Sequence, residues 1–304
     1  MSTQILSVII PSYNEAANIE RTYEALKSGL KEIPFEVFFV DDGSKDGTYE
    51  IVEKLHETHP EVKGISFSRN YGKEAAIFAG LEAATGDCAV LMDCDLQHPV
   101  EVIPQMYQLW KEGYEVVEGV KASRGKEGIF HKICAKLFYR YISKATGIDM
   151  SRASDFKLLD RKAIDALLIL PERAPFFRAL SSWIGFKSTS VAFEVKDREL
   201  GSSKWSFKSL ARYAIHNITS FSGAPLQLVT FLGWVMFLFT VILGIQTLYR
   251  YFSGTAMEGF TTVILLLLFI GSVLMLSLGI IGHYISRIYD EIKARPRYIV
   301  RKRC

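Results

Sequence analysis

The chain has 304 residues, of which 49% are hydrophobic and 23% are charged, with a formal net charge of +3. This length suits one large domain with an appendage, or two domains. The small net charge excludes a bulk attraction to nucleic acid. The four cysteines form no Cys-x-x-Cys pair, so neither a zinc site nor a disulfide framework is indicated.

Four apolar runs in the first part of the chain are typical of buried β-strands. They are ILSVIIPSYNE, in which the strand is expected to end at Pro11, and then FEVFFVDDGS, VKGISFSRN and CAVLMDCD. A helical pattern follows each run, at residues 15–31, 46–58, 73–84 and 100–111. Near-continuous apolar strands that alternate with helices predict an α/β fold, with a mostly parallel sheet covered by helices on both faces.

A polar cluster follows each predicted strand. The clusters are Ser12-Tyr13-Asn14-Glu15, Asp41-Asp42, Arg69-Asn70 and Asp93-Cys94-Asp95. Ligands of such sheets bind at the carboxyl ends of the strands, so we expect these clusters to form one site.

Asp93 and Asp95 lie two residues apart, and in an extended chain such residues point to the same side. Their mutual repulsion favours a cation between them. These turns contain no glycine-rich phosphate-binding loop. We therefore expect a divalent ion held by Asp93, Asp95 and the phosphate oxygens of a substrate.

Two later segments, at about residues 128–146 and 206–222, carry a basic residue at every fourth position opposite an apolar face. Such helices lie at a membrane surface or pack on a protein core. The second segment directly precedes a long apolar run, which favours the membrane surface. For the first segment both alternatives stay open.

Two apolar runs near the C-terminus predict transmembrane helices. Residues 226–249 contain no charged residue, and residues 260–285 contain one histidine but no Asp, Glu, Lys or Arg. Both runs exceed the ~20 residues that cross a hydrocarbon core of about 30 Å. The basic tail, residues 286–304, is expected in the cytoplasm. Two crossings then make residues 1–225 a cytoplasmic domain of a multi-pass cell-membrane protein with both termini in the cytoplasm.

Six motifs in chain order, VIIPSYNE, VDDGSKDGT, RNYGKEAA, DCDLQHP, SDFKLLDR and RELGSSKW, resemble those of family 2 glycosyltransferases with the GT-A fold. More narrowly, they resemble the polyprenyl-phosphate glycosyltransferases, the branch of the GtrB-type enzymes and dolichyl-phosphate mannose synthase. The resemblance covers nearly the whole chain. It implies a GT-A domain, a nucleotide-sugar donor, a lipid-phosphate acceptor, Mg²⁺ or Mn²⁺ as cofactor, and inversion at the anomeric carbon.

The resemblance assigns the nucleoside end of the donor site to the first two motifs. Pro11, Tyr13 and Glu15 match the motif that lines the nucleoside pocket. Asp41 and Asp42 match an acidic pair that accepts hydrogen bonds from the base or the ribose. Asp42 has an alternative role, because an Asp-Gly-Ser sequence also stabilises a turn.

The next motifs extend the donor site. Gly72 and Lys73 match a segment beside the nucleotide, although Gly72 can also simply begin a helix. Asp93 and Asp95 match the metal-binding motif, with Asp95 as the direct ligand and a catalytic residue. His98 either faces the donor or lies at the surface.

The last two motifs concern the acceptor. Asp155 aligns with the position of a catalytic base, but a lipid phosphate has a second pKa near ~6 and needs little help to lose its proton. We therefore expect Asp155 to position the acceptor or the sugar, with base catalysis as the alternative. Arg198, Ser203 and Lys204 match the phosphate-binding stretch, and Arg124 is a weaker candidate for the same anion.

The expected function is inverting transfer of glucose from UDP-glucose to undecaprenyl or another polyprenyl phosphate at the cytoplasmic membrane face, for modification of cell-envelope glycans. UDP-N-acetylhexosamine and GDP-mannose stay open as donors, and so does a homo-oligomeric assembly. A processive polysaccharide synthase would carry a Gln-x-x-Arg-Trp motif, which this chain lacks. A non-catalytic membrane scaffold would not need to keep all five acids of the motifs, Asp41, Asp42, Asp93, Asp95 and Asp155.

Overall fold

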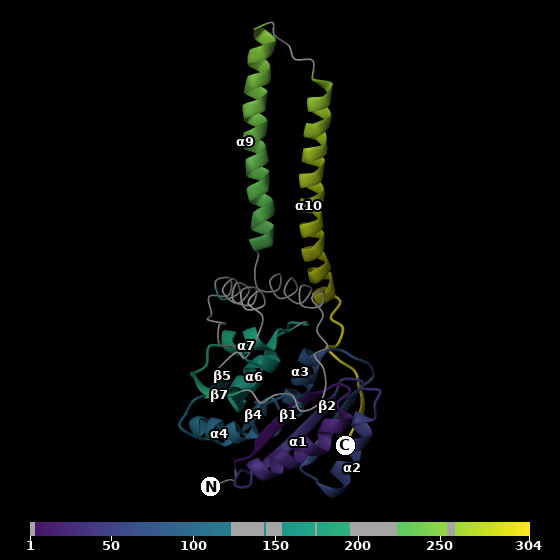
Figure 1. Ribbon diagram of the computed structural model, residues 1–304, viewed down its shortest axis with the longest axis vertical. Helices are drawn as coiled ribbons and strands as arrows, with labels where there is room; N and C mark the ends of the chain where they lie inside the picture. The colour runs from purple at the N-terminus through teal and green to yellow at the C-terminus, as the bar shows by residue number, and fades with distance from the viewer. Residues whose placement is uncertain (1–3, 123–142, 144–153, 174, 195–223, 254–258) are drawn as a thin grey trace. The chain divides into compact units, whose positions relative to one another are not determined.

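The computed structural model describes residues 4–122, 143, 154–173, 175–194, 224–253 and 259–304. By its internal contacts the chain divides into two units. One comprises Met1–Phe207 together with Arg295–Cys304, and the other comprises Lys208–Ala294. The first unit is an α/β domain, and the second holds two long apolar helices (Figure 1).

Among the described residues, the α/β domain contains one eight-stranded sheet with the order β7-β5-β6-β4-β1-β2-β3-β8. The four strands predicted from the sequence form its parallel centre. They are β1 (Leu6–Ser12), β2 (Phe35–Asp41), β3 (Val62–Phe67) and β4 (Cys88–Leu91). The outer strands are β5 (Val116–Lys121), β6 (Lys157–Asp160), β7 (Ser188–Phe193) and β8 (Val300–Arg303). Because β6 and β8 run antiparallel to their neighbours, the sheet is mixed but mostly parallel, as predicted.

The helices confirm the sequence pattern. Helices α1 (Ala16–Gly29), α2 (Thr48–Thr58) and α3 (Lys73–Ala83) follow the first three strands. The turn η1 (Val100–Val102) leads into α4 (Ile103–Lys111) after β4. Two further helices, α6 (Arg161–Ile169) and α7 (Phe177–Trp183), come after β6.

Helices cover both faces of the sheet. On one face, Val8 and Ile10 of β1 are buried in a core cluster with Tyr23 of α1 and Met106 of α4. On the other face, Ile9 packs against α3 so closely that a Cβ at Gly80 would lie 2.3 Å from its Cγ2. Glycine at position 80 therefore allows α3 to approach the sheet.

Strand β1 extends past Pro11 to Ser12, whereas the sequence predicted that it ends at the proline. Along a strand, the backbone N–H and C=O groups of successive residues point toward opposite neighbouring strands. Ile9 accepts the N–H of Met92 beyond β4, and Ser12 accepts the N–H of Asp42 beyond β2. The nitrogen of Pro11 therefore faces the side where β4 has already ended, and no ladder hydrogen bond is lost.

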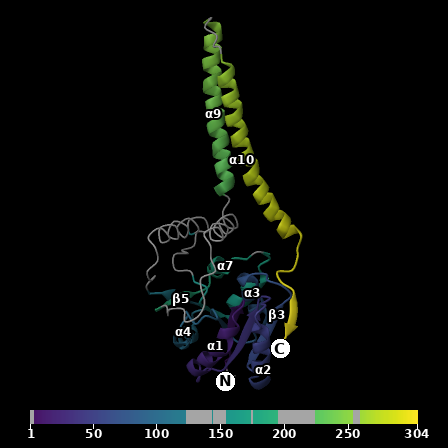
Figure 2. The ribbon, with the colours of Figure 1, turned by 45° about the vertical axis from the view of Figure 1, so that its right-hand side comes forward.

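The C-terminal residues belong to the α/β domain. Strand β8 pairs with β3 at the edge of the sheet, as the yellow strand in Figure 2 shows. Just before it, Arg297 donates hydrogen bonds to the carbonyl oxygens of Leu170 and Glu172 and lies 4.7 Å from the ring centroid of Phe78 on α3. The sequence did not predict this strand because the tail is rich in basic residues. On an edge strand such charged side chains can point to solvent.

The second unit consists of α9 (Ala224–Phe252) and α10 (Phe260–Ile292), with 29 and 33 residues. At a rise of 1.5 Å per residue they are about 43 and 50 Å long. The mean hydropathy is 2.4 over Leu226–Gln246 and 2.2 over Leu266–Ile292. Large apolar side chains such as Trp234, which is 67% exposed, cover their surfaces. By length and composition, both are candidate membrane spans.

Replacing Arg297 by Ala removes the guanidinium that joins the C-terminal segment to the α6–α7 connection and to α3. We expect the free energy of unfolding to fall by about 1–3 kcal/mol, because two hydrogen bonds and a cation–π contact are lost. The loss should appear as a lower midpoint temperature of thermal unfolding, measured on the full chain in detergent. Arg301→Ala, at an exposed position of β8, is the matched control, and equal effects of the two substitutions would contradict the assignment.

Candidate active site

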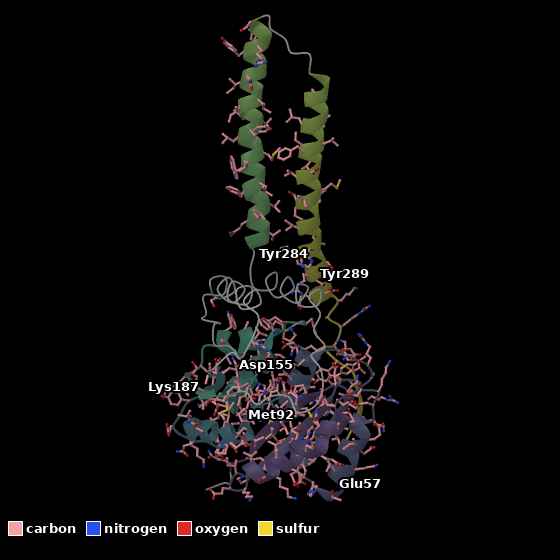
Figure 3. All side chains as sticks on the ribbon, viewed as in Figure 1. Glu57, Met92, Asp155, Lys187, Tyr284 and Tyr289 are labelled. Atoms are coloured by element: carbon pink, nitrogen blue, oxygen red, sulfur yellow. The ribbon has the colours of Figure 1, made fainter. Side chains whose placement is uncertain are left out.

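The candidate site lies at the carboxyl ends of the central parallel strands, where the predicted polar clusters come together. Asp155 joins them because β6 runs antiparallel to β4, with Lys157 opposite Leu91. The residues before β6 therefore lie beside the residues after β4. In Figure 3, Asp155 lies toward one end of the α/β domain and Glu57, near the end of α2, lies at the other.

Asp155 is clamped between two cations. Nζ of Lys73, the first residue of α3, lies 2.9 Å from Oδ2 of Asp155 and 2.6 Å from Oδ1 of Asp93. Arg178 of α7 donates two hydrogen bonds to Asp155, from Nε to Oδ1 at 2.6 Å and from Nη2 to Oδ2 at 2.7 Å. Such a two-pronged pair fixes the orientation of the carboxylate.

These cations control the ionisation of the acids. Burial would raise the pKa of Asp155, but the Lys73 ammonium and the Arg178 guanidinium outweigh burial and hold it well below its ordinary value. The pKa of Asp93 is also lowered: burial opposes this, and the charge of Lys73 prevails. Both carboxylates therefore stay ionised at neutral pH, and Asp155 is a poor proton acceptor there.

Sequence reasoning missed Arg178 and the residue that holds its helix in place. Lys157 of β6 is fully buried, and its Nζ donates to Glu118 of β5 at 2.6 Å and to Oγ of Ser181 of α7 at 2.8 Å. This buried ammonium ties α7, and with it Arg178, to the sheet. The signal was present in PFFRALSSWIGF, where an arginine is the single charged residue of an otherwise uncharged stretch.

Asp41 and Asp42 hold the loops at the rim of the site. Asp41, 2% exposed, accepts hydrogen bonds from the N–H of Ser44 at 2.9 Å and from Oγ of Ser66 at 2.7 Å. Asp42 accepts the N–H groups of Tyr71 and Gly72 at 2.6 and 2.8 Å. Asp42 thus fixes the residues just before Lys73, and its recognition of the nucleoside stays a prediction.

Gly72 is both part of the rim and the start of a helix. Its φ of +99° lies in the region that favours glycine, and it is the N-cap residue of α3. This turn sets the position of the Lys73 backbone, and therefore the point from which its side chain extends.

The loop after β1 is fastened to the loop after β2. Asn14, with φ of +54°, donates its N–H to Oγ of Ser44 at 2.8 Å, and Glu15 donates its N–H to Oγ1 of Thr48 at 3.0 Å. Tyr13 is 39% exposed at this edge. Pro11, Tyr13 and Glu15 are thus placed beside Asp41 and Asp42, and their contact with a nucleoside stays a prediction.

The aspartates after β4 are not in extended chain. Strand β4 ends at Leu91, Asp93 lies in the following loop, and Asp95 lies in a turn that continues into Leu96 with φ of +55°. The argument that Asp93 and Asp95 share a side because they are part of a strand is therefore wrong. Their relation is determined by the turn, whose backbone N–H at Gln97 donates to Oδ1 of Asp95 at 3.2 Å.

His98 is buried beside the acids of the site. It is 7% exposed, its ring stacks on Phe156 with centroids 4.8 Å apart, and its Nδ1 accepts the N–H of Asp93 at 3.2 Å. The alternative of a surface histidine is therefore wrong. Burial lowers the pKa of His98, and the carboxylates of Asp93, Asp95 and Asp155 act in the opposite direction.

The carboxylates that follow β4 suit a hard divalent cation. Asp93 and Asp95 offer carboxylate oxygens, which Mg²⁺ and Mn²⁺ prefer. Asp93 is 35% exposed and already lies against one cation, the Lys73 ammonium. Within the described part of the chain, no group of three His, Cys, Asp or Glu side chains is arranged to hold a metal. Two carboxylates do not complete the coordination of such an ion, so further ligands would have to come from outside this pair.

Four predicted acceptor-site residues lie outside the described residues: Arg124, Arg198, Ser203 and Lys204. The two predicted amphipathic helices, at about 128–146 and 206–222, lie there as well, apart from residue 143. Their roles stay predictions.

Comparison with known proteins gives consistent family matches. The model of the family "Glycosyl transferase family 2" matches residues 7–168. "Uncharacterized glycosyltransferase YkcC" of Bacillus subtilis (strain 168) is 41% identical over 304 residues, covering 97% of this chain and 93% of that protein. "Bactoprenol glucosyl transferase" of Shigella phage SfII is 35% identical over 304 residues, covering 98% and 97%. At this coverage both similarities include the two apolar helices.

Solved structures support the fold. The crystal structure of glucosyl-3-phosphoglycerate synthase from Mycobacterium tuberculosis, in complex with Mn²⁺, UDP and phosphoglyceric acid, has a TM-score of 0.54 to this chain. It is 20% identical and covers 72% of this chain and 79% of its own. The similarity confirms the predicted GT-A-like α/β fold.

Glu74 gives the site a testable pH dependence. It accepts the N–H of Phe177 at 2.9 Å, and burial together with the charge of Asp155 raises its pKa to about 7. A carboxyl with a raised pKa binds its proton more tightly in the folded state, so it lowers stability as pH rises from ~4.3 toward 7. Glu74→Gln keeps an acceptor but cannot ionise. We expect its stability to vary less between pH 5 and 7, measured by denaturant unfolding at several pH values.

Glu57→Gln, at an exposed position of α2, is the control for the loss of one carboxylate, and it should keep the wild-type pH dependence. If the curves of Glu74→Gln and the wild type run parallel, Glu74 does not titrate in this range.

Proposed function

Because this chain belongs to glycosyltransferase family 2, we propose that it transfers glucose from UDP-glucose to a polyprenyl phosphate, with inversion at the anomeric carbon. The observation that carries the proposal is the 35% identity to a bactoprenol glucosyl transferase over 98% of the chain. A soluble acceptor would not account for a similarity that extends through both apolar helices.

In this proposal the donor lies across the carboxyl ends of β1, β2 and β4. Tyr13, 39% exposed at the rim, offers a ring for contact with the uracil base. Asp41 and Asp42 hold the loops around the base and the ribose. UDP is bound by the solved glucosyl-3-phosphoglycerate synthase of the same fold, which supports a uridine nucleotide here.

Asp93 and Asp95 would hold the Mg²⁺ or Mn²⁺, with Asp95 as the direct ligand. The ion, when bound, neutralises the charge that develops on the departing diphosphate. The carboxylates of Asp93 and Asp95 provide the negative charge that brings the ion to this edge of the sheet.

Asp155 positions the reacting groups in this proposal. The acceptor phosphate has a second pKa near ~6 and is already mostly deprotonated at neutral pH. One of its oxygens attacks the anomeric carbon while the bond to the diphosphate breaks, and no proton has to move. Asp155, whose pKa is held low by Lys73 and Arg178, contributes orientation rather than basicity.

The acceptor phosphate is assigned to Arg198, Ser203 and Lys204, with Arg124 as a weaker candidate. A guanidinium beside an ammonium suits a phosphate. These residues precede the first apolar helix in the sequence, where a lipid phosphate would enter from the bilayer.

We propose that α9 and α10 cross the cell membrane and that residues 1–225 and 286–304 lie in the cytoplasm, with 226–285 as the membrane domain. That the segment Arg295–Cys304 belongs to the same unit as the α/β domain supports a chain that leaves and re-enters on one side of the membrane, as two crossings would allow.

The function can be tested with membranes that contain the overexpressed full chain, undecaprenyl phosphate, Mg²⁺ and radiolabelled UDP-glucose. We expect label in the organic phase, and less from UDP-N-acetylhexosamine or GDP-mannose.

Asp95→Asn should lower transfer by about 100-fold or more, because a metal ligand is lost. Asp165→Asn, at a 59% exposed position of α6, should transfer as the wild type does. Transfer that survives EDTA, or a preference for another nucleotide sugar, would overturn the proposal in that respect.

The role of Asp155 can be tested by the pH dependence of kcat/KM. The acid limb should lie near pH ~6, where the acceptor phosphate ionises. Because the pKa of Asp155 is far lower, Asp155→Asn should reduce the rate at every pH and leave this limb in place. If the limb vanishes in Asp155→Asn but not in Asp165→Asn, then Asp155 acts as a base.

A further inference from the structure

The ammonium of Lys73 lies in the place where the site needs positive charge. Its Nζ is 2.6 Å from Oδ1 of Asp93 and 2.9 Å from Oδ2 of Asp155. Asp93 is also the carboxylate that, with Asp95, is assigned to the divalent ion. A divalent cation on Asp93 would lie within a few ångströms of this ammonium, and two positive charges at that separation repel each other strongly. Lys73 and the ion therefore compete for Asp93.

The contact between Lys73 and Asp93 is within reach of a soluble ion. The two side chains are 41% and 35% exposed, so the pair is only partly shielded from water. Lys73 keeps a second partner when it leaves Asp93, because Asp155 remains within reach. Lys157, the other lysine near the site, is different because it is fully buried and paired with Glu118. If it left Glu118, a buried charge would lose its partner, which is costly.

The backbone under Lys73 is held firmly, so the side chain is the part that moves. Asp42 accepts the N–H groups of Tyr71 and Gly72. The C-terminal segment also holds α3, through Arg297 over Phe78 at the middle of the helix and through the Tyr298 hydroxyl, which donates to Glu82 near its end. A lysine side chain has four rotatable bonds, so its ammonium can change partners while its Cα stays in place.

We propose that Lys73 is an internal counter-ion that occupies Asp93 before the donor binds and is exchanged for the divalent ion that accompanies the donor. After the exchange the ammonium remains paired with Asp155, and its charge is available to the diphosphate as the sugar departs. Lys73 thus acts in two ways: it weakens metal binding when no donor is present, and it strengthens transfer when the donor is bound. This inference rests on the proposed function.

The test is the affinity of the full chain for Mn²⁺ without donor, measured by electron paramagnetic resonance of the free ion. Lys73→Met removes the charge at nearly constant length, and we expect Mn²⁺ to bind about tenfold more tightly, because the apparent affinity is the intrinsic affinity multiplied by the fraction of sites left unoccupied. Lys73→Arg keeps the competing charge and should bind Mn²⁺ as the wild type does. Transfer by Lys73→Met should fall by about 100-fold.

A lysine outside the site controls for net charge. Lys111→Met, at an exposed position of α4, should change neither Mn²⁺ affinity nor transfer. Thermal unfolding of each variant checks that it is folded. Unchanged or weaker Mn²⁺ binding by folded Lys73→Met overturns the inference, while metal-dependent transfer by the wild type still supports the proposed function. If the wild type binds no Mn²⁺ and transfers no sugar, both fail.

Discussion

The carboxylates gathered at one edge of the sheet repel one another, and the site exists only because positive charge is supplied among them. Lys73 and Arg178 supply it from two helices, and Asp155 is the point at which both meet. The pKa of Asp155 is lowered as a result, although burial alone would raise it. A permanently ionised, rigidly held carboxylate suits a reaction in which the nucleophile is already charged and the difficulty lies in bringing two anions together.

Much of the surrounding structure serves to hold these two cations. Helix α7 carries Arg178 and is tied to the sheet by the buried Lys157. Helix α3 carries Lys73 and begins at the loop fixed by Asp42. The C-terminal segment that follows α10 contacts this helix at Phe78 and Glu82. The chain therefore returns from its apolar helices to contribute to the same domain that contains the acids. In the proposed function, a lipid-linked acceptor and a soluble donor would meet because one chain provides both the apolar helices and the polar site.

The sequence was a good guide wherever a feature depends on local pattern. The four parallel strands and the helices between them were predicted from apolar runs that alternate with helical patterns, because burial imposes these patterns directly on the residues. The two apolar helices were predicted from the length of their apolar runs. The strand pattern placed Asp41, Asp42 and Asp93 correctly at strand ends or just beyond them. The prediction for Pro11 was wrong, because whether a proline ends a strand depends on the neighbour its nitrogen faces, and the sequence does not contain that neighbour.

By itself, then, the sequence determined the fold class and the family, since both depend on patterns within short stretches of consecutive residues. Only the tertiary structure decided which cations meet the acids of the site. Arg178 lies 23 residues from Asp155 and Lys73 lies 82 residues away, and their meeting requires β6 to turn back beside β4. The strand formed by the last residues was likewise hidden, because its partner β3 lies far earlier in the chain. Pairings between distant segments depend on sheet order and register, and no local pattern records them.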